Sequence, residues 1–120
     1  MVTNTRTPIV AASVKDFEST SKMKVILQGH EIMLAKVNGN YYAVDNRCAH
    51  MGGDLSAGQL DGTIITCPRH GSQYDVTDGH NVRWLGPGFL NAMLKSINST
   101  PKPVRSYKVQ VLGQNIMVEI

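Results

Sequence analysis

The sequence lacks any apolar run that approaches the ~20 residues of a membrane-spanning helix. Its N-terminal stretch, MVTNTRTPIVAAS, also lacks the apolar segment of about 7–15 residues that marks a signal peptide. From these two absences we expect a cytoplasmic protein with no membrane partner.

Clustered charge of one sign is missing as well. Twelve Lys and Arg residues stand against nine Asp and Glu residues, which gives a formal net charge of +3. The basic residues are scattered singly, whereas nucleic-acid binding needs a concentrated basic patch or stripe. We therefore predict no nucleic-acid partner and, at most, a weak attraction for an acidic protein.

Repeats and low-complexity tracts are absent too, and nothing in the sequence marks a domain boundary. A chain of 120 residues can bury roughly two thirds of the surface of its unfolded state, so it does not need a metal merely to fold. We expect a single domain over residues 1–120.

What the chain does contain is short β-strand patterns. MKVIL and EIMLAKV flank a turn at Gly29, and Asn38-Gly39 before YYAV is a strong hairpin signal. Near the C-terminus, apolar residues alternate with polar ones on both sides of a turn at Gly113. These patterns predict an all-β fold, a small antiparallel barrel or sandwich.

One segment departs from the β pattern. In GPGFLNAMLKSINSTPKP the apolar residues recur at helical spacing, and a proline lies on each side. We predict one short amphipathic helix over residues 88–97, whose apolar side either packs on the barrel or docks a partner.

The only two cysteines each have a histidine just beyond them: Cys48-x-His50, then sixteen residues, then Cys67-x-x-His70. A disulfide would explain neither histidine, and disulfides are rare in the cytosol. Nucleophilic catalysis needs one activated thiol with its base, not two matching Cys-His units. Two thiolates and two imidazoles instead supply four ligands, enough for zinc or for an iron–sulfur cluster.

The spacing bears on which metal these residues hold. Structural zinc sites usually pair Cys with Cys and His with His, whereas here each short unit is mixed. A two-iron cluster with two Cys on one iron and two His on the other uses mixed units, because each loop then sends one ligand to each iron. Flanking glycines at positions 52, 53 and 71 would let backbone N–H groups approach the sulfides.

The pattern C-x-H-x₁₆-C-x₂-H, set in CAHMGGDL and CPRHGSQYD, resembles the cluster-binding signature of Rieske proteins. VNGNYYAVDNRCAH and VRSYKVQVLGQNIMVEI resemble the flanking strands, so the resemblance covers most of the chain. The stretch around residues 80–102 is longer than the compact family pattern. The resemblance implies one 2Fe-2S cluster per chain, held by loops at about 48–56 and 67–75.

Carried over to this sequence, the resemblance makes Cys48 and Cys67 the ligands of the buried iron. His50 and His70 would bind the outer iron and provide the electron exit. Leu55 and Pro68 match positions that shape and shield the loops. The remaining histidines, at positions 30 and 80, match no ligand position.

Two hydroxyl positions also match the family. In high-potential Rieske proteins, the residues equivalent to Ser72 and Tyr74 donate hydrogen bonds to a bridging sulfide and to a cysteine sulfur. Reduction adds negative charge to the sulfurs, so such donors would raise the redox potential. The alternative is that Tyr74 only fills the barrel and Ser72 bonds to the backbone.

Within the family, the sequence excludes two roles. The proteins of cytochrome bc complexes have an anchor and a second cysteine pair, where this chain has Gly53 and Arg69. Terminal oxygenases add a domain with a mononuclear iron held by two His and a carboxylate, for which no length remains.

What remains resembles a Rieske ferredoxin: a one-electron carrier between a reductase and an acceptor, typically a terminal oxygenase, with no catalysis and no substrate of its own. Two alternatives stay open. The chain could be a small Rieske-like subunit of an assimilatory nitrite reductase, or a zinc-stabilised interaction module.

Overall fold

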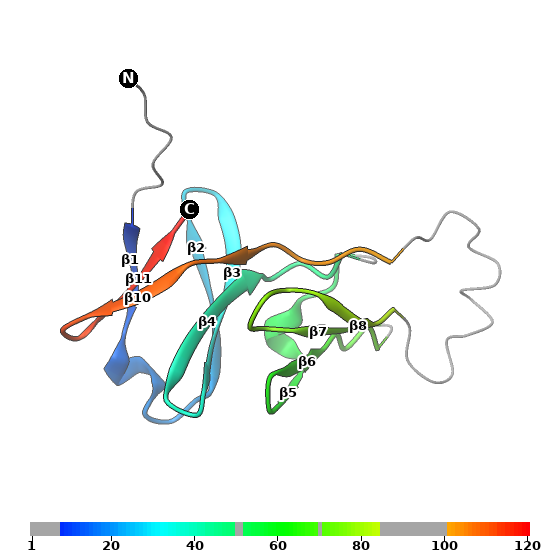
Figure 1. The fold of residues 1–120 in the computed structure, drawn as a ribbon, viewed down its shortest axis with the longest axis horizontal. Helices are drawn as coiled ribbons and strands as arrows, with labels where there is room; N and C mark the ends of the chain where they lie inside the picture. The colour runs from blue at the N-terminus through cyan, green and yellow to red at the C-terminus, as the bar shows by residue number, and fades with distance from the viewer. Residues whose placement is uncertain (1–7, 50–51, 70, 85–100) are drawn as a thin grey trace, which may run out of the picture.

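The computed structural model describes residues 8–49, 52–69, 71–84 and 101–120. These residues form antiparallel strands in three sheets, with strand orders β1-β11-β10, β2-β3-β4-β9 and β5-β6-β7-β8 (Figure 1). The elements are β1 (Pro8–Ser13), η1 (Val14–Phe17), β2 (Lys22–Leu27), β3 (His30–Val37), β4 (Asn40–Asp45), η2 (Leu55–Ala57), β5 (Gln59–Asp61), β6 (Ile64–Thr66), β7 (Gln73–Asp75), β8 (Asn81–Arg83), β9 (Ser106–Tyr107), β10 (Val109–Leu112) and β11 (Asn115–Glu119).

The predicted hairpins are confirmed. β2 pairs with β3, and β3 with β4, in regular antiparallel register. The two connecting turns have positive φ at both central residues, at Gln28 and Gly29 (50° and 81°) and at Asn38 and Gly39 (52° and 81°). This is the type I′ geometry whose twist matches that of the paired strands.

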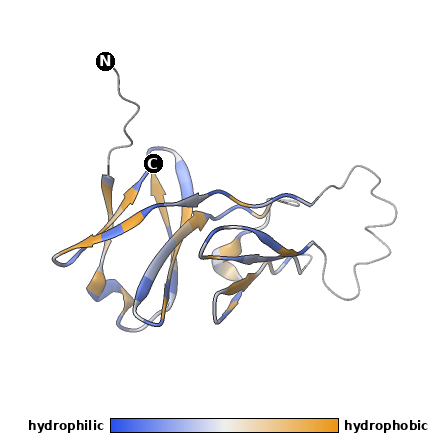
Figure 2. Cartoon of the chain, viewed as in Figure 1, coloured by the Kyte–Doolittle hydropathy of each residue, from blue (hydrophilic) through white to orange (hydrophobic). Residues whose placement is uncertain are grey.

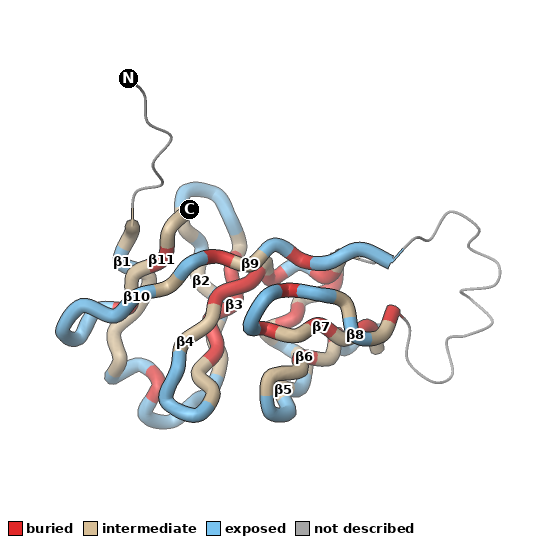
Figure 3. The backbone as a smooth tube through the Cα atoms, in the orientation of Figure 1, coloured by how far each residue is buried: buried red, intermediate tan, exposed pale blue. Residues whose placement is uncertain are grey.

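β3 contains four consecutive fully buried residues, and its two sides face different cores. Ile32 and Leu34 pack with residues of β11, whereas Met33 and Ala35 pack with residues of the β5–β8 sheet. The sheet β2-β3-β4-β9 therefore has a core on each side, which explains why its central strand shows no polar alternation. Figure 3 shows this strand among the most buried parts of the chain.

The sheet β1-β11-β10 brings the two ends of the described chain together, since Pro8 pairs with Glu119. The alternating pattern near the C-terminus predicts the β10–β11 hairpin, which is confirmed. The N-terminal strand β1 had no such prediction. Its burial is intermediate along nearly its whole length, so no clear periodicity marks it.

The sheet β5–β8 lies between β4 and β9 in the sequence and beside the sheet β2-β3-β4-β9 in space (Figure 1). Its core contains both cysteines together with Leu55, Ile65 and Tyr74. Figure 2 shows apolar residues on the strands of all three sheets. The all-β antiparallel fold is thus confirmed.

The helix predicted over residues 88–97 lies outside the described residues. Within the described part of the chain, no helix has the length and hydropathy needed to cross a membrane.

Candidate metal centre

The first cysteine lies in a loop that directly follows β4 and closes on itself through two backbone hydrogen bonds. The N–H of Cys48 donates to the carbonyl oxygen of Gly53, and the N–H of Gly52 donates to that of Cys48, both at 2.8 Å. Gly52 has a φ of +71°, in the left-handed region that favours glycine. We call residues 48–53 the first loop.

The second cysteine lies in a loop between β6 and β7 that has the same bonding. The N–H of Cys67 donates to the carbonyl oxygen of Ser72 (2.7 Å), and the N–H of Gly71 donates to that of Cys67 (3.0 Å). Gly71 has a φ of +80°. We call residues 67–72 the second loop. The two loops place their cysteines at equivalent backbone positions, the arrangement expected of two loops that grip one group from two sides.

The two loops also touch. A Cβ added at Gly53, in the first loop, would lie only 2.6 Å from Sγ of Cys67 and 3.2 Å from Cβ of Arg69. A glycine at position 53 therefore allows the first loop to approach the thiol of the second. Gly53 and Arg69 face each other where the extra cysteine pair of high-potential Rieske proteins is expected, and this chain has no cysteine at either position.

Both thiols are buried, with residue exposures of 4% for Cys48 and 2% for Cys67. They are not joined in a disulfide. The sequence-predicted ligands His50 and His70 lie outside the described residues, so their role as ligands stays a prediction. The other histidines, His30 and His80, are exposed, and Nδ1 of His80 lies 2.6 Å from the Asp78 carboxylate.

The two hydroxyls of interest lie on or next to β7. Oη of Tyr74 is 3.4 Å from Sγ of Cys48, and burial, followed by the interaction with Cys48, raises the pKa of the phenol. Ser72 is fully buried, and its hydroxyl donates to the carbonyl oxygen of Trp84. Tyr74 therefore lies where a donor to the cysteine sulfur is needed, whereas the structure gives the Ser72 proton a backbone acceptor.

Residues 7–107 match the family model described as the Rieske [2Fe-2S] domain. The chain belongs to the Rieske family. Its cofactor is the family's 2Fe-2S cluster. It is 37% identical over 112 residues to the ferredoxin component of the naphthalene 1,2-dioxygenase system of Pseudomonas putida, covering 93% of this chain and 94% of that protein.

Two further comparisons agree with this. The ferredoxin component of the naphthalene 1,2-dioxygenase/salicylate 5-hydroxylase systems of Ralstonia sp is 31% identical over 86% of this chain and 92% of its own length. Among solved structures, the ferredoxin of carbazole 1,9a-dioxygenase from Nocardioides aromaticivorans IC177 matches with a TM-score of 0.76 and 26% identity, covering 94% of this chain and 97% of that one.

The residues of this Rieske domain fit the cluster on the structure's own geometry. Two buried thiols on equivalent, mutually contacting loops can each supply one thiolate to one iron. The cluster supplies one-electron chemistry when bound. The protein's own contribution is to bury the sulfurs, to fix both loops by internal hydrogen bonds, and to place the Tyr74 hydroxyl beside Cys48.

The base of the first loop of this Rieske domain contains a pair of residues that the sequence pattern did not identify. Asn46 is fully buried, and its side chain donates to the Asp54 carboxylate (2.7 Å) and accepts from the N–H of Ser56 (2.8 Å). Hydrogen bonds from Ser56, then from Asn46, lower the pKa of Asp54. The available signal for this pair was in the sequence, where an Asn lies just before the first loop and an Asp directly after it.

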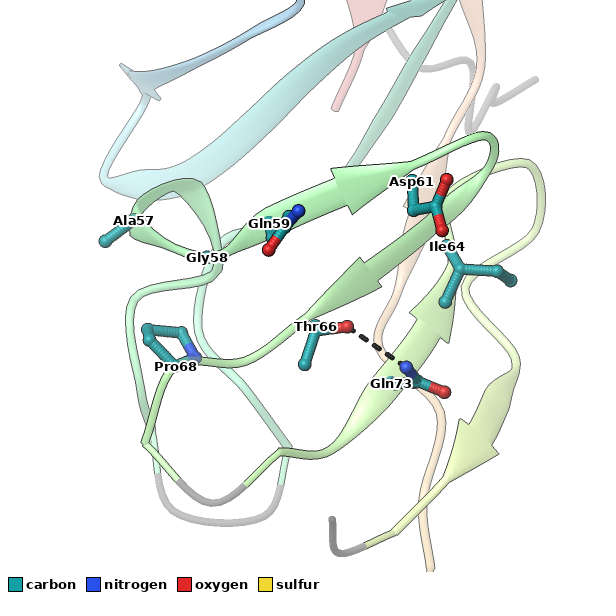
Figure 4. A pocket seen from close by; sticks show the side chains of 8 residues that line it. All are labelled: Ala57, Gly58, Gln59, Asp61, Ile64, Thr66, Pro68 and Gln73. Carbon is teal, nitrogen blue, oxygen red and sulfur yellow. Dashed lines mark hydrogen bonds between the residues drawn. The ribbon is translucent and has the colours of Figure 1, made fainter. Parts of the chain in front are cut away.

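A recess of about 670 Å³ lies on the β5–β7 face beside the second loop (Figure 4). It is lined by Ala57, Gly58, Gln59, Asp61, Ile64, Thr66, Pro68 and Gln73. Neither cysteine is among these residues, so the recess is separate from the thiols. Pro68 stands at this surface, whereas Leu55 is fully buried in the core that contains both cysteines.

Proposed function

We propose that this chain, as one Rieske domain over residues 1–120, carries single electrons from a reductase to a terminal oxygenase in the cytoplasm. Cys48, His50, Cys67 and His70 hold its one cluster. The observation that carries the proposal is the pair of buried thiols on two equivalent loops that touch at Gly53.

The ferredoxin role is favoured by the relatives. This chain aligns with nearly the full length of ferredoxin components of naphthalene dioxygenase systems, whose names identify them as parts of an oxygenase system. Four protein ligands leave the cluster without an open position, so the chain transfers electrons and is not itself a catalyst.

The first experiment is a visible spectrum with iron and sulfide analysis of aerobically purified protein. We expect a red-brown protein with about two irons and two acid-labile sulfides per chain, as a Rieske 2Fe-2S cluster requires. A colourless protein that contains zinc would support the interaction module instead.

The second experiment measures electron transfer. The reductase and oxygenase of a naphthalene dioxygenase system serve as donor and acceptor, and stopped-flow absorbance follows reduction and reoxidation of the cluster. We expect both steps to be observed. Oxidation by a nitrite reductase but not by the oxygenase would favour the nitrite reductase subunit.

Salt dependence tests how the partners meet. With a formal charge of +3, electrostatic steering of this chain toward its partner proteins should be modest. The electron-transfer rate should therefore fall about tenfold or less between ~0.05 and ~0.5 M salt. A fall over several decades would reveal a concentrated basic surface at the docking site and contradict our interpretation of the charge pattern.

A further inference from the structure

An arginine on β8 binds the second loop. Nε and Nη2 of Arg83 both donate to the carbonyl oxygen of Gly71, at 3.2 and 3.1 Å. Arg83 is half-buried. It lies on β8, which pairs with β7, the strand that directly follows the second loop. A forked donor from a strand outside the loop therefore holds one specific loop oxygen.

A second arginine does the same for the first loop. Nη1 of Arg47 donates to the carbonyl oxygen of Gly52 at 3.1 Å. Its Nε and Nη2 donate to the Glu31 carboxylate on β3, at 3.2 and 2.8 Å, which fixes the direction of the guanidinium. The Arg47 side chain is 63% exposed, so this contact is the more weakly shielded of the two.

The two carbonyl groups occupy equivalent positions. Gly52 and Gly71 are each the fourth residue after a cysteine, each has a left-handed φ, and each donates its N–H to that cysteine's carbonyl. Two arginines from unrelated places in the sequence thus bind the same atom of the two loops. Neither arginine bond is needed to form the strands or to close the loops, because the loops already close through their own backbone hydrogen bonds.

The consequence for the loops follows from the planar trans peptide, in which N–H and C=O point in opposite directions. An arginine that holds the carbonyl of Gly52 in one direction fixes the N–H of Gly53 in the opposite direction, and the bond to the carbonyl of Gly71 does the same for Ser72. Gly53 is the residue whose added Cβ would meet Sγ of Cys67 at 2.6 Å. Arg47 therefore controls backbone that lies against the sulfur of Cys67, and Arg83 controls Ser72, whose carbonyl accepts the N–H of Cys67.

We propose that Arg47 and Arg83 are paired positioning residues of the cluster, which fix the two cysteine loops through the equivalent glycine carbonyls and place positive charge beside them. This inference rests on the proposed cluster site. Reduction adds negative charge to the cluster, so the two guanidinium groups raise the midpoint potential as well as slow the loss of the cluster.

The test compares Arg83→Gln and Arg83→Lys with the wild-type holoprotein. Loss of visible absorbance in a chelator gives the rate of cluster loss, and protein-film voltammetry gives the midpoint. We expect Arg83→Gln to lose its cluster about tenfold faster, with a lower midpoint, because a charge-assisted hydrogen bond is removed. Arg83→Lys should lose it nearly as fast but keep most of the midpoint, because lysine keeps the charge and lacks the fork.

The same pair of substitutions at Arg47 should give the same directions with smaller changes, about threefold in rate, because that side chain is more exposed. Arg105→Gln is the matched control, because Arg105 is exposed and lies outside both loops, 4.6 Å from the centroid of the Tyr107 ring. The change removes a positive charge without removing a bond to a glycine carbonyl, and should leave the loss rate within about twofold of wild type.

Equal loss rates in Arg83→Gln, Arg47→Gln and Arg105→Gln would overturn the positioning role. If Arg83→Gln accumulates no cluster, the loss rate of Arg83→Lys is compared with that of wild type instead. A wild-type protein without a cluster would contradict the proposed function. A wild type that holds a cluster, with substitutions of Arg47 and Arg83 that change neither its loss rate nor its midpoint, would contradict this inference alone.

Discussion

Gly53 provides the sharpest test of how the two cysteine loops meet. Alanine at this position would place its methyl carbon 2.6 Å from Sγ of Cys67, about 0.9–1.4 Å inside the usual contact of about 3.5–4.0 Å between nonbonded heavy atoms. The φ of Gly53 is not in the left-handed region, so Gly53→Ala adds a collision without adding backbone strain.

The collision must displace either the Cys67 sulfur or the first loop. Overpacking of a buried site costs about 1–3 kcal/mol. A sulfur displaced by about 1 Å also leaves the metal–ligand tolerance of about 0.2 Å. We therefore expect Gly53→Ala to lower iron content at purification and to speed cluster loss at least tenfold.

The adjacent glycine is a matched control. A Cβ at Gly52 meets nothing within 4 Å, but its φ of +71° makes any side chain strained. Gly52→Ala should therefore cost about 1–2 kcal/mol of stability and keep the cluster of the molecules that fold. Iron content, cluster-loss rate and urea unfolding of both variants separate the two effects. Wild-type iron content and loss rate in Gly53→Ala would refute the loop contact.

Three further predictions follow from other contacts. Tyr74→Phe should lower the midpoint by about 40 mV, since a hydrogen bond to Cys48 that strengthens on reduction by about 1 kcal/mol corresponds to that shift; an unchanged value in voltammetry would limit Tyr74 to packing. His70→Ala should lose its colour, and an unchanged spectrum with normal iron would end its assignment as a ligand. Burial, then the hydrogen bond to Asp45, raises the pKa of Tyr107 to about 12 from 10.0. The neutral Tyr107 phenol therefore stabilises the folded state fully below pH 10, and this stabilisation is lost as the pH rises through about 12. Tyr107→Phe should lower the free energy of unfolding by about 1–2 kcal/mol at pH 8. That difference should shrink above pH 10 in urea titrations, and a constant difference would show that Tyr107 is not the titrating group.

The longer strands could be predicted because their local signals agree. The turns at Gly29 and Asn38-Gly39 require positive φ, and the sequence supplies residues that tolerate it. β5 to β8 were harder, because each has three residues and a strand that short shows no periodicity. Their formation depends on packing around the cysteines, which is tertiary information.

The candidate site divides in the same way. The cysteine spacing and the flanking glycines are visible in the sequence, since the chemistry demands those residue types. The bonds from Arg47 and Arg83 were not predictable, because both arginines look like ordinary surface charges and Arg83 follows its acceptor by twelve residues. The acceptor of the Ser72 proton, the Trp84 carbonyl, also depends on strand pairing that no local pattern encodes.

The excursion of the chain between β4 and β9 has a consequence for how this protein can change over evolution. The chain leaves the central sheet at β4 and returns beside it at β9, and the N–H of Val104 donates to the carbonyl of Gly79, just before β8, at 2.9 Å. A Cβ added at Gly79 would lie 2.1 Å from the carbonyl oxygen of Val104, and the φ of Gly79 is +81°. Val104 is buried in the core that contains both cysteines. Selection should therefore keep glycine at position 79, because a side chain there would push apart the returning chain and the core around the cysteines.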